Sequence, residues 1–241
     1  RQVNAQTTSF GLDVQRLLCD RGNNSAYDFL TCTSGNLGDD EFHLRGDGNA
    51  PADGSFTGGG ADYAEYFEWK DGNTSDEDRV GISVKLDGDM IVASSDSDNA
   101  SDIIGVISAN PSITGDSAWN KWNQKYLKDD YGRYIWEEYT TTEWSEEVNG
   151  ANQSVSYETD KIPSDVTVPS DAKVVSEDST GAKFTRRKLN PDWDESKTYI
   201  AREDRKEWDT VGLVGKLRIK KGQKTGTNWI KMRDISDTVE E

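Results

Sequence analysis

The chain has 241 residues, a formal net charge of -17 and only 33% hydrophobic residues. Nucleic acid is excluded as a partner because its phosphate backbone would be repelled, and no apolar run is long enough to span a bilayer. His43 is the only histidine, so a zinc site lacks ligands and a catalytic triad would depend on this one strand-like residue. Carboxylates or a Ser/Thr–Lys pair remain as candidate catalytic groups.

Residues 1–61 are predicted to form short strands separated by tight turns. Apolar residues alternate at 10–14, and strand-like segments follow at 27–32 and 41–45, closed by turns such as Gly46-Asp47-Gly48. Strands this short fit the distal end of a β-structured shaft in which neighbouring chains supply partners. Cys19 and Cys32 do not form a patterned disulfide framework, which favours synthesis in a reducing cytoplasm.

Small and flexible residues fill 50–61 and predict a linker and domain boundary there. The linker ends in three glycines, which suit a bend or a close approach between backbones, followed by ADYAEYFEW at 61–69. Asp62, Glu65 and Glu68 are three residues apart, so on a helical turn their carboxylates would lie along one face. Adjacent carboxylates can divide acid and base roles between them. A solvated acidic segment is the alternative, since structural carboxylate clusters are common.

The rest of the chain is predicted to be mainly β with one or two short helices. Residues 79–86 and 90–93 predict a hairpin, and the apolar runs at 103–108 and 211–217 predict buried strands. Trp119, Trp122 and Tyr126 form one stripe of a short helix over 119–127. A last strand is expected at 229–232. The acidic loop 94–102 lacks the central Gly and final Glu of a calcium loop, so no metal site is predicted.

Several ordered motifs carry a resemblance to a known family. After ADYAEYFEW and DGN (71–73) come IIGVISANP (103–111), GDSAW (115–119), KYL (125–127), DYGR (130–133), VGLVGK (211–216) and NWIKM (228–232). Together they resemble the C-terminal intramolecular-chaperone autoprotease domain of phage tailspike and neck-appendage proteins, classed among the glutamic peptidases. The resemblance covers residues 62–241.

The resemblance implies a homotrimeric chaperone domain at 62–241 that follows the end of a spike shaft and linker at 1–61. Such a domain promotes trimerisation and then cuts itself off between Ala61 and Asp62, with Asp62 and Glu65 as the reactive carboxylates. Glu65 is expected to act as a base toward water, and Asp62 as an acid or an internal nucleophile. Many members are expected to have Ser where this chain has Ala61, so a mechanism needing that hydroxyl is not available here.

The implied setting is a virion tail spike or fibre, assembled in the host cytoplasm, with the chaperone domain released after cleavage. Identical chains are the expected partners, with no nucleic acid and no membrane, and host-surface glycans would be contacted through the parent spike. No cofactor is predicted, and a nucleotide role in release is left open. The alternatives are a structural or receptor-binding fibre tip that never cuts, and a Ser–Lys autoprotease for which spacing places no pair.

Overall fold

The computed structural model describes residues 15–19, 24–35, 38–118, 124–148 and 150–241. Within them the fold is mainly β, and the helices are short 3-10 turns rather than α-helices: η1 (Ala100–Asp102), η2 (Thr159–Lys161) and η3 (Arg202–Asp204). None of these helices is long and apolar enough to cross a membrane. The chain divides into two compact units, which we call the sheet unit (56–125 and 194–241) and the hairpin unit (1–55 and 126–193).

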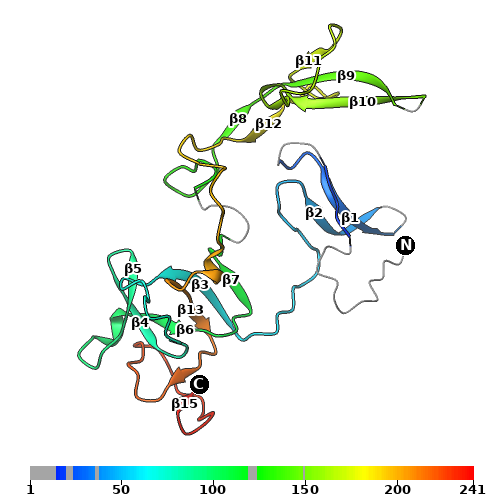
Figure 1. Cartoon of the computed structure of the whole chain (residues 1–241). Helices are drawn as coiled ribbons and strands as arrows, with labels where there is room; N and C mark the ends of the chain where they lie inside the picture. Colours follow the sequence, from blue (N-terminus) through cyan, green and yellow to red (C-terminus); the bar gives the residue numbers. More distant parts are fainter. Residues whose placement is uncertain (1–14, 20–23, 36–37, 119–123, 149) are drawn as a thin grey trace, which may run out of the picture. The chain divides into compact units, whose positions relative to one another are not determined.

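The sheet unit is built on a six-stranded sheet with the order β5-β4-β6-β13-β3-β7. The strands are β3 (Asp62–Glu68), β4 (Ser83–Asp87), β5 (Met90–Ala93), β6 (Ile103–Ile107), β7 (Ile113–Gly115) and β13 (Trp208–Gly215). Neighbouring strands are antiparallel except β3 and β7, which are parallel. β3 lies between β13 and β7 (Figure 1). This topology places β13, which comes late in the chain, between β6 and β3.

Alternating apolar residues bury one face of this sheet. Side chains directly opposite each other on paired strands share a face, and Val211 pairs with Ile107 while both are almost fully buried. Trp69, Val84 and Ile91 complete that core cluster, against which Phe67 packs. The predicted hairpin at 79–93 is confirmed as β4 and β5, and the predicted buried strands at 103–108 and 211–217 are confirmed as β6 and β13.

The segment that follows β13 contacts the opposite face of the sheet, where Leu217 Cδ2 lies 2.8 Å from the position of an added Cβ on Gly212. The Ser83 N–H donates to Gln223 Oε1 (3.3 Å), and the Lys220 N–H donates to the Gly81 carbonyl (2.8 Å). This segment carries β14 (Ile219–Lys220), which pairs with β15 (Val239–Glu240). The strand predicted at 229–232 is wrong: these residues form no ladder, and Ile230 is 90% exposed.

The hairpin unit consists of small antiparallel sheets. β1 (Asp28–Ser34) pairs with β2 (Asp39–Arg45), and β8 (Trp136–Glu138) pairs with β12 (Thr185–Arg187). A third sheet has the order β10 (Ala151–Glu158), β9 (Thr141–Val148) and β11 (Lys173–Val175). The strands predicted at 27–32 and 41–45 are confirmed as β1 and β2.

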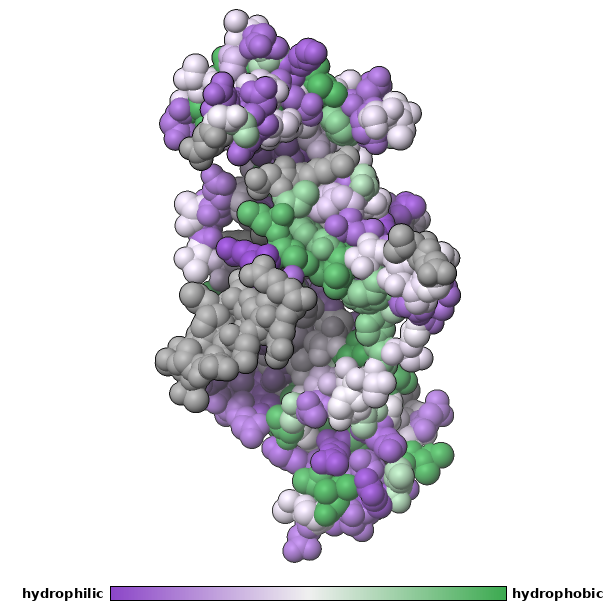
Figure 2. Space-filling model, turned by 90° about the vertical axis from the view of Figure 1, so that its right-hand side faces the viewer, coloured by the Kyte–Doolittle hydropathy of each residue, from purple (hydrophilic) through white to green (hydrophobic). Residues whose placement is uncertain are grey.

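Figure 2 shows a surface that is largely hydrophilic, with hydrophobic residues in separate patches.

Two predictions concern residues that the structure covers only in part. The strand at 10–14 lies outside the described residues, as does most of the helix predicted over 119–127, and the described residues 124–127 are not helical. The division at residue 61 between shaft and chaperone domain stays a prediction. It differs from the spatial grouping, in which the hairpin unit takes residues from both sides of that boundary.

Candidate active site

The predicted scissile bond, Ala61–Asp62, enters the sheet at the first residue of β3. The helical turn considered for this segment is wrong, because residues 62–68 form a strand between β13 and β7. Side chains alternate between the two faces of a strand, so residues three apart point to opposite sides. Asp62 and Glu65 are therefore on opposite faces of the sheet, and Glu68 shares the face of Asp62. One chain does not bring the two predicted catalytic carboxylates together.

Asp62 is buried against a glycine of the neighbouring strand. Its side chain lies over Gly212, where an added Cβ would stand 2.6 Å from Asp62 Oδ2 and 2.8 Å from Leu217 Cδ2. The residue is 7% exposed, and none of the described residues donates a hydrogen bond to Oδ2. A buried polar atom without a partner costs folding free energy and marks a position held by something other than stability. Asp62 is thus desolvated beside the peptide bond that precedes it.

Glu65 lies on the other face, beside Tyr63. The Tyr63 hydroxyl donates to Glu65 Oε1 at 2.6 Å, and this hydrogen bond raises the pKa of Tyr63. Gly115 of β7 leaves room for both, since an added Cβ there would come 2.6 Å from the Tyr63 hydroxyl and 3.0 Å from Glu65 Cγ. Tyr63 is flanked across the sheet by Val214 and Ile113, which are 66% and 61% exposed. We call Val214, Tyr63 and Ile113 the Tyr63 row. Glu65 is therefore next to an open, largely apolar strip.

Backbone donors hold the carbonyl groups on both sides of the bond. The Lys216 N–H donates to the Ala61 carbonyl at 3.3 Å, and the Ser112 N–H donates to the Asp62 carbonyl at 2.7 Å. Gly215 makes the first contact possible, because its φ is +121° and an added Cβ would stand 2.5 Å from the Ala61 oxygen. A bulge at Leu213 shifts the register of β13 between Gly212 and Val214. These contacts fix the orientation of the Ala61–Asp62 peptide.

The glycine run before the bond packs against the loop that precedes β7. An added Cβ on Gly60 would overlap the backbone of residues 110–112, and one on Gly58 would overlap Ser112. The expectation of a close backbone approach at these glycines is confirmed. The neighbouring cavity of about 450 Å³ runs along the bond and is also lined by the cationic residues Lys216, Arg218 and Lys220. Arg218 is paired with Glu241 (Nε to Oε1, 3.6 Å), so it is Lys216 and Lys220 that make the surface next to the candidate cleavage position locally basic.

Other candidate groups have structural partners. His43 lies on β2 between Asp28 (Nδ1 to Oδ2, 3.0 Å) and Asp40 (Nε2 to Oδ2, 3.1 Å), whose carboxylates raise its pKa.

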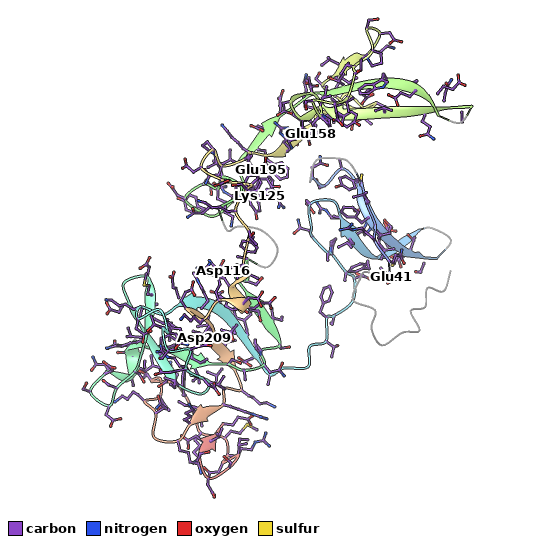
Figure 3. The ribbon with its side chains drawn as sticks, viewed as in Figure 1. Glu41, Asp116, Lys125, Glu158, Glu195 and Asp209 are labelled. Carbon is purple, nitrogen blue, oxygen red and sulfur yellow. The ribbon has the colours of Figure 1, made fainter. Side chains whose placement is uncertain are left out.

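A second cavity in the sheet unit is lined by Arg202 and Arg205, and both arginines are paired with carboxylates. Arg202 pairs with Asp116 (2.5 Å), which is labelled in Figure 3, and Arg205 pairs with Glu207. Across the described ranges, no group of three or more His, Cys, Asp and Glu residues is arranged to hold a metal ion.

Sequence reasoning missed the residues that contact the bond from β13. Gly212, Gly215 and Lys216 were interpreted as part of a buried strand and of the family motif VGLVGK at 211–216, with no role at the bond. The available signal was the pair of glycines within that strand, since glycine inside a strand often marks a bulge or a close approach of another backbone. The pairing of β13 with β3 could not be read from periodicity, so the partner of those glycines remained unknown.

Comparisons with known proteins identify a matching family and relatives of this chain. Residues 20–241 match the family described as Peptidase_G2, IMC autoproteolytic cleavage domain. The chain is 30% identical over 176 residues to the preneck appendage protein of Bacillus phage PZA and to the pre-neck appendage protein of Bacillus phage phi29. Each alignment covers 72% of this chain and 16% of the relative, so the chain spans about a sixth of the length of those proteins.

The fold is also similar to a solved structure. The crystal structure of the pre-mature bacteriophage phi29 gene product 12 superposes with a TM-score of 0.59 and 24% sequence identity. The superposition covers 83% of this chain and 24% of that one. At this identity the likeness concerns the fold alone, and it supports the mainly β architecture.

Proposed function

This chain belongs to the family of IMC autoproteolytic cleavage domains, and from that premise we propose that it cuts its own Ala61–Asp62 bond after helping identical chains to trimerise. The parent protein would be a phage tail appendage. The observation that carries the proposal is the buried carboxylate of Asp62, which has an unpartnered oxygen beside the bond. Such a group is costly for folding and suited to chemistry.

Asp62 acts in this proposal as the internal nucleophile. One of its carboxylate oxygens attacks the Ala61 carbonyl carbon through a six-membered ring, the C–N bond breaks, and the leaving amine takes up a proton. The product is an anhydride between the Ala61 carbonyl and the Asp62 side chain. Water then attacks the anhydride and gives two carboxylates, so the sum is hydrolysis of one peptide bond. Burial favours the first step, because desolvation makes an ionised oxygen more reactive.

Glu65 is proposed as the base that activates this water, acting on a neighbouring chain. Within one chain it lies on the wrong face of the sheet, yet it borders the Tyr63 row, where Val214 and Ile113 are exposed. An exposed apolar strip favours contact with another protein surface. In a trimer such a contact would carry Glu65 of one chain to the bond of the next, and cleavage would follow assembly.

Cleavage after assembly gives the domain a single-turnover role. The domain would assist folding of the appendage in the host cytoplasm, and the part from Asp62 onward would be released while the rest stays with the virion tail. The trimer, the carboxylate mechanism and the release form one proposal, because assembly completes the site that cuts this bond and the cut releases the domain.

Mass spectrometry of the purified chain tests the proposal. We expect a fragment that begins at Asp62 in the wild type, and intact chains for Asp62→Asn and Glu65→Gln. Glu68→Gln is the matched control, since it changes another glutamate of β3 that has no assigned role, and it should be cut normally. An intact wild-type chain in the assembled state would instead indicate a structural or receptor-binding fibre tip. Normal cutting of Glu65→Gln would refute its role as base.

A further inference from the structure

We propose that the backbone N–H of Lys216 is the oxyanion donor for cleavage of the Ala61–Asp62 bond, and that Gly215 exists to admit it. This inference deepens the proposed function and rests on it. It adds a catalytic group to the two carboxylates, drawn from β13 rather than from the strand that is cut.

The geometry places this donor on a reacting atom. When a nucleophile adds to the Ala61 carbonyl carbon, the π electron pair moves onto its oxygen, which becomes negatively charged until the C–N bond breaks. The Lys216 N–H already points at that oxygen from 3.3 Å. Donors aimed at a developing oxyanion are among the largest contributions to catalysis of acyl transfer.

The length of this contact favours the transition state. A distance of 3.3 Å is long for a hydrogen bond to a neutral carbonyl. Hydrogen bonds to an oxyanion are shorter, about 2.7–2.9 Å, and stronger. A donor that is held slightly too far from the neutral carbonyl makes a weak hydrogen bond to it. The same hydrogen bond strengthens when negative charge develops on the oxygen. Only interactions that strengthen in the transition state accelerate the chemical step.

Gly215 is the residue that permits this approach. Its φ of +121° lies where residues with a side chain are strained, and an added Cβ would meet the Ala61 oxygen at 2.5 Å and Asp62 Cα at 2.8 Å. The last pair of the ladder between β13 and β3 is Gly215 with Asp62, so the next residue along β13 reaches the preceding carbonyl. Lys216 itself is exposed, and it also lines the cavity that runs along the bond.

Replacement of the amide at residue 216 by an ester tests the proposal, using the α-hydroxy analogue of lysine in the full chain. The ester removes the N–H, weakens the preceding carbonyl as an acceptor and keeps the side chain, and the control carries the same changes. The matched control is the same replacement at Lys221, whose N–H donates to the Thr238 carbonyl (2.9 Å) away from the bond. We expect the single-turnover cleavage rate to fall about 10²–10³-fold at 216 relative to the 221 control. Melting temperature and assembly should be similar in both.

Gly215→Ala provides a second variant, compared with Gly222→Ala. Gly222 also has a positive φ (+83° against +121°) but nothing within 4 Å of an added Cβ, so it controls for a side chain at positive φ without the contact. Gly215→Ala should slow cleavage and Gly222→Ala should not. The oxyanion role alone would be overturned if the wild type is cut normally, the 216 ester is cut as fast as the 221 ester, and Gly215→Ala is cut as fast as Gly222→Ala. A wild-type chain that never yields the Asp62 fragment would overturn the proposed function and this inference with it.

Discussion

Two glycines of β13 set how closely the strand backbones approach at the cleavage position. Gly215 lies under the Ala61 carbonyl and Gly212 lies under the Asp62 carboxylate. Neither position tolerates a methyl group without displacing the atoms that are proposed to react. Small displacements of reacting groups cost large factors in rate, so these glycines bear on activity as well as packing.

We therefore expect Gly212→Ala to lower the cleavage rate about tenfold or more, because its Cβ would stand 2.6 Å from Asp62 Oδ2. Single-turnover assays followed by intact mass would measure this. Gly54→Ala is the control, since an added Cβ at Gly54 has nothing within 4 Å. Equal rates for the two variants would show that the Asp62 carboxylate does not need its present position.

A second residue-scale prediction concerns pH. Asp209, labelled in Figure 3, accepts a hydrogen bond from Trp69 Nε1 (2.7 Å), and its burial raises its pKa. A raised carboxyl pKa means that the folded state holds its proton more tightly than the unfolded state. This contribution to stability is present at low pH and is lost as the pH rises through the folded pKa.

Asp209→Asn keeps an acceptor for Trp69 and removes the dependence of stability on pH that comes from the Asp209 carboxyl. Its melting temperature relative to wild type should rise as the pH increases from about 3.5, just below the ordinary Asp pKa of about 3.9, to about 6. Thermal denaturation across this range measures the difference. A gap that stays constant or shrinks with pH would contradict the direction of the shift.

At this scale the sequence could identify Ala61, Asp62 and Glu65 through their resemblance to family motifs, but it could not place them relative to one another. A spacing of three brings side chains together on a helix and separates them on a strand. The aromatic residues Tyr63, Tyr66 and Phe67 favour a strand, and this preference, not the spacing of the acids, agrees with the observed conformation. The role of Lys216 was invisible because a backbone N–H has no residue signature.

Among the elements, β6 and β13 form the centre of the sheet and position β3. Ile107 is 1% exposed and pairs with Val211 across the two strands. Ile107→Ala should destabilise the sheet unit by about 2–5 kcal/mol, through lost burial and the cavity left behind. Leu86→Ala on β4 is the control, since Leu86 is 48% exposed and should cost much less. Denaturant unfolding compares the two, and equal losses would contradict this description of the core.

Elements with strong local signals were predictable. The β4–β5 hairpin follows from alternation around Asp87-Gly88-Asp89, and β6 follows from a continuous apolar run. The failure at 229–232 has a physical reason: Ile230 and Met232 are exposed rather than packed, and only the end of the segment hydrogen-bonds to the residues around β15. Pairing of β3 with both β13 and β7 depends on contacts far apart in sequence, which local periodicity does not encode.

For the whole molecule, the Tyr63 row is the surface proposed to meet a neighbouring chain. Ile113→Glu places a charge in this row, and burial of an unpaired charge is costly, so assembly should weaken. We expect sedimentation to show a shift toward monomer at the same concentration, accompanied by slower cleavage. Val174→Glu is the control, because Val174 is similarly exposed (65% against 61%) but lies in the hairpin unit. Unchanged assembly of Ile113→Glu would remove this row from the interface.

Complementation between two inactive chains tests the central claim most directly. Asp62→Asn carries a mass tag and is co-expressed with untagged Glu65→Gln, and each is also expressed alone. If Asp62 acts on its own bond and Glu65 acts on the next chain, mixed assemblies will cut the Glu65→Gln chains and leave the Asp62→Asn chains intact, while neither is cut alone. Mixed assemblies in which no chain is cut would contradict the account.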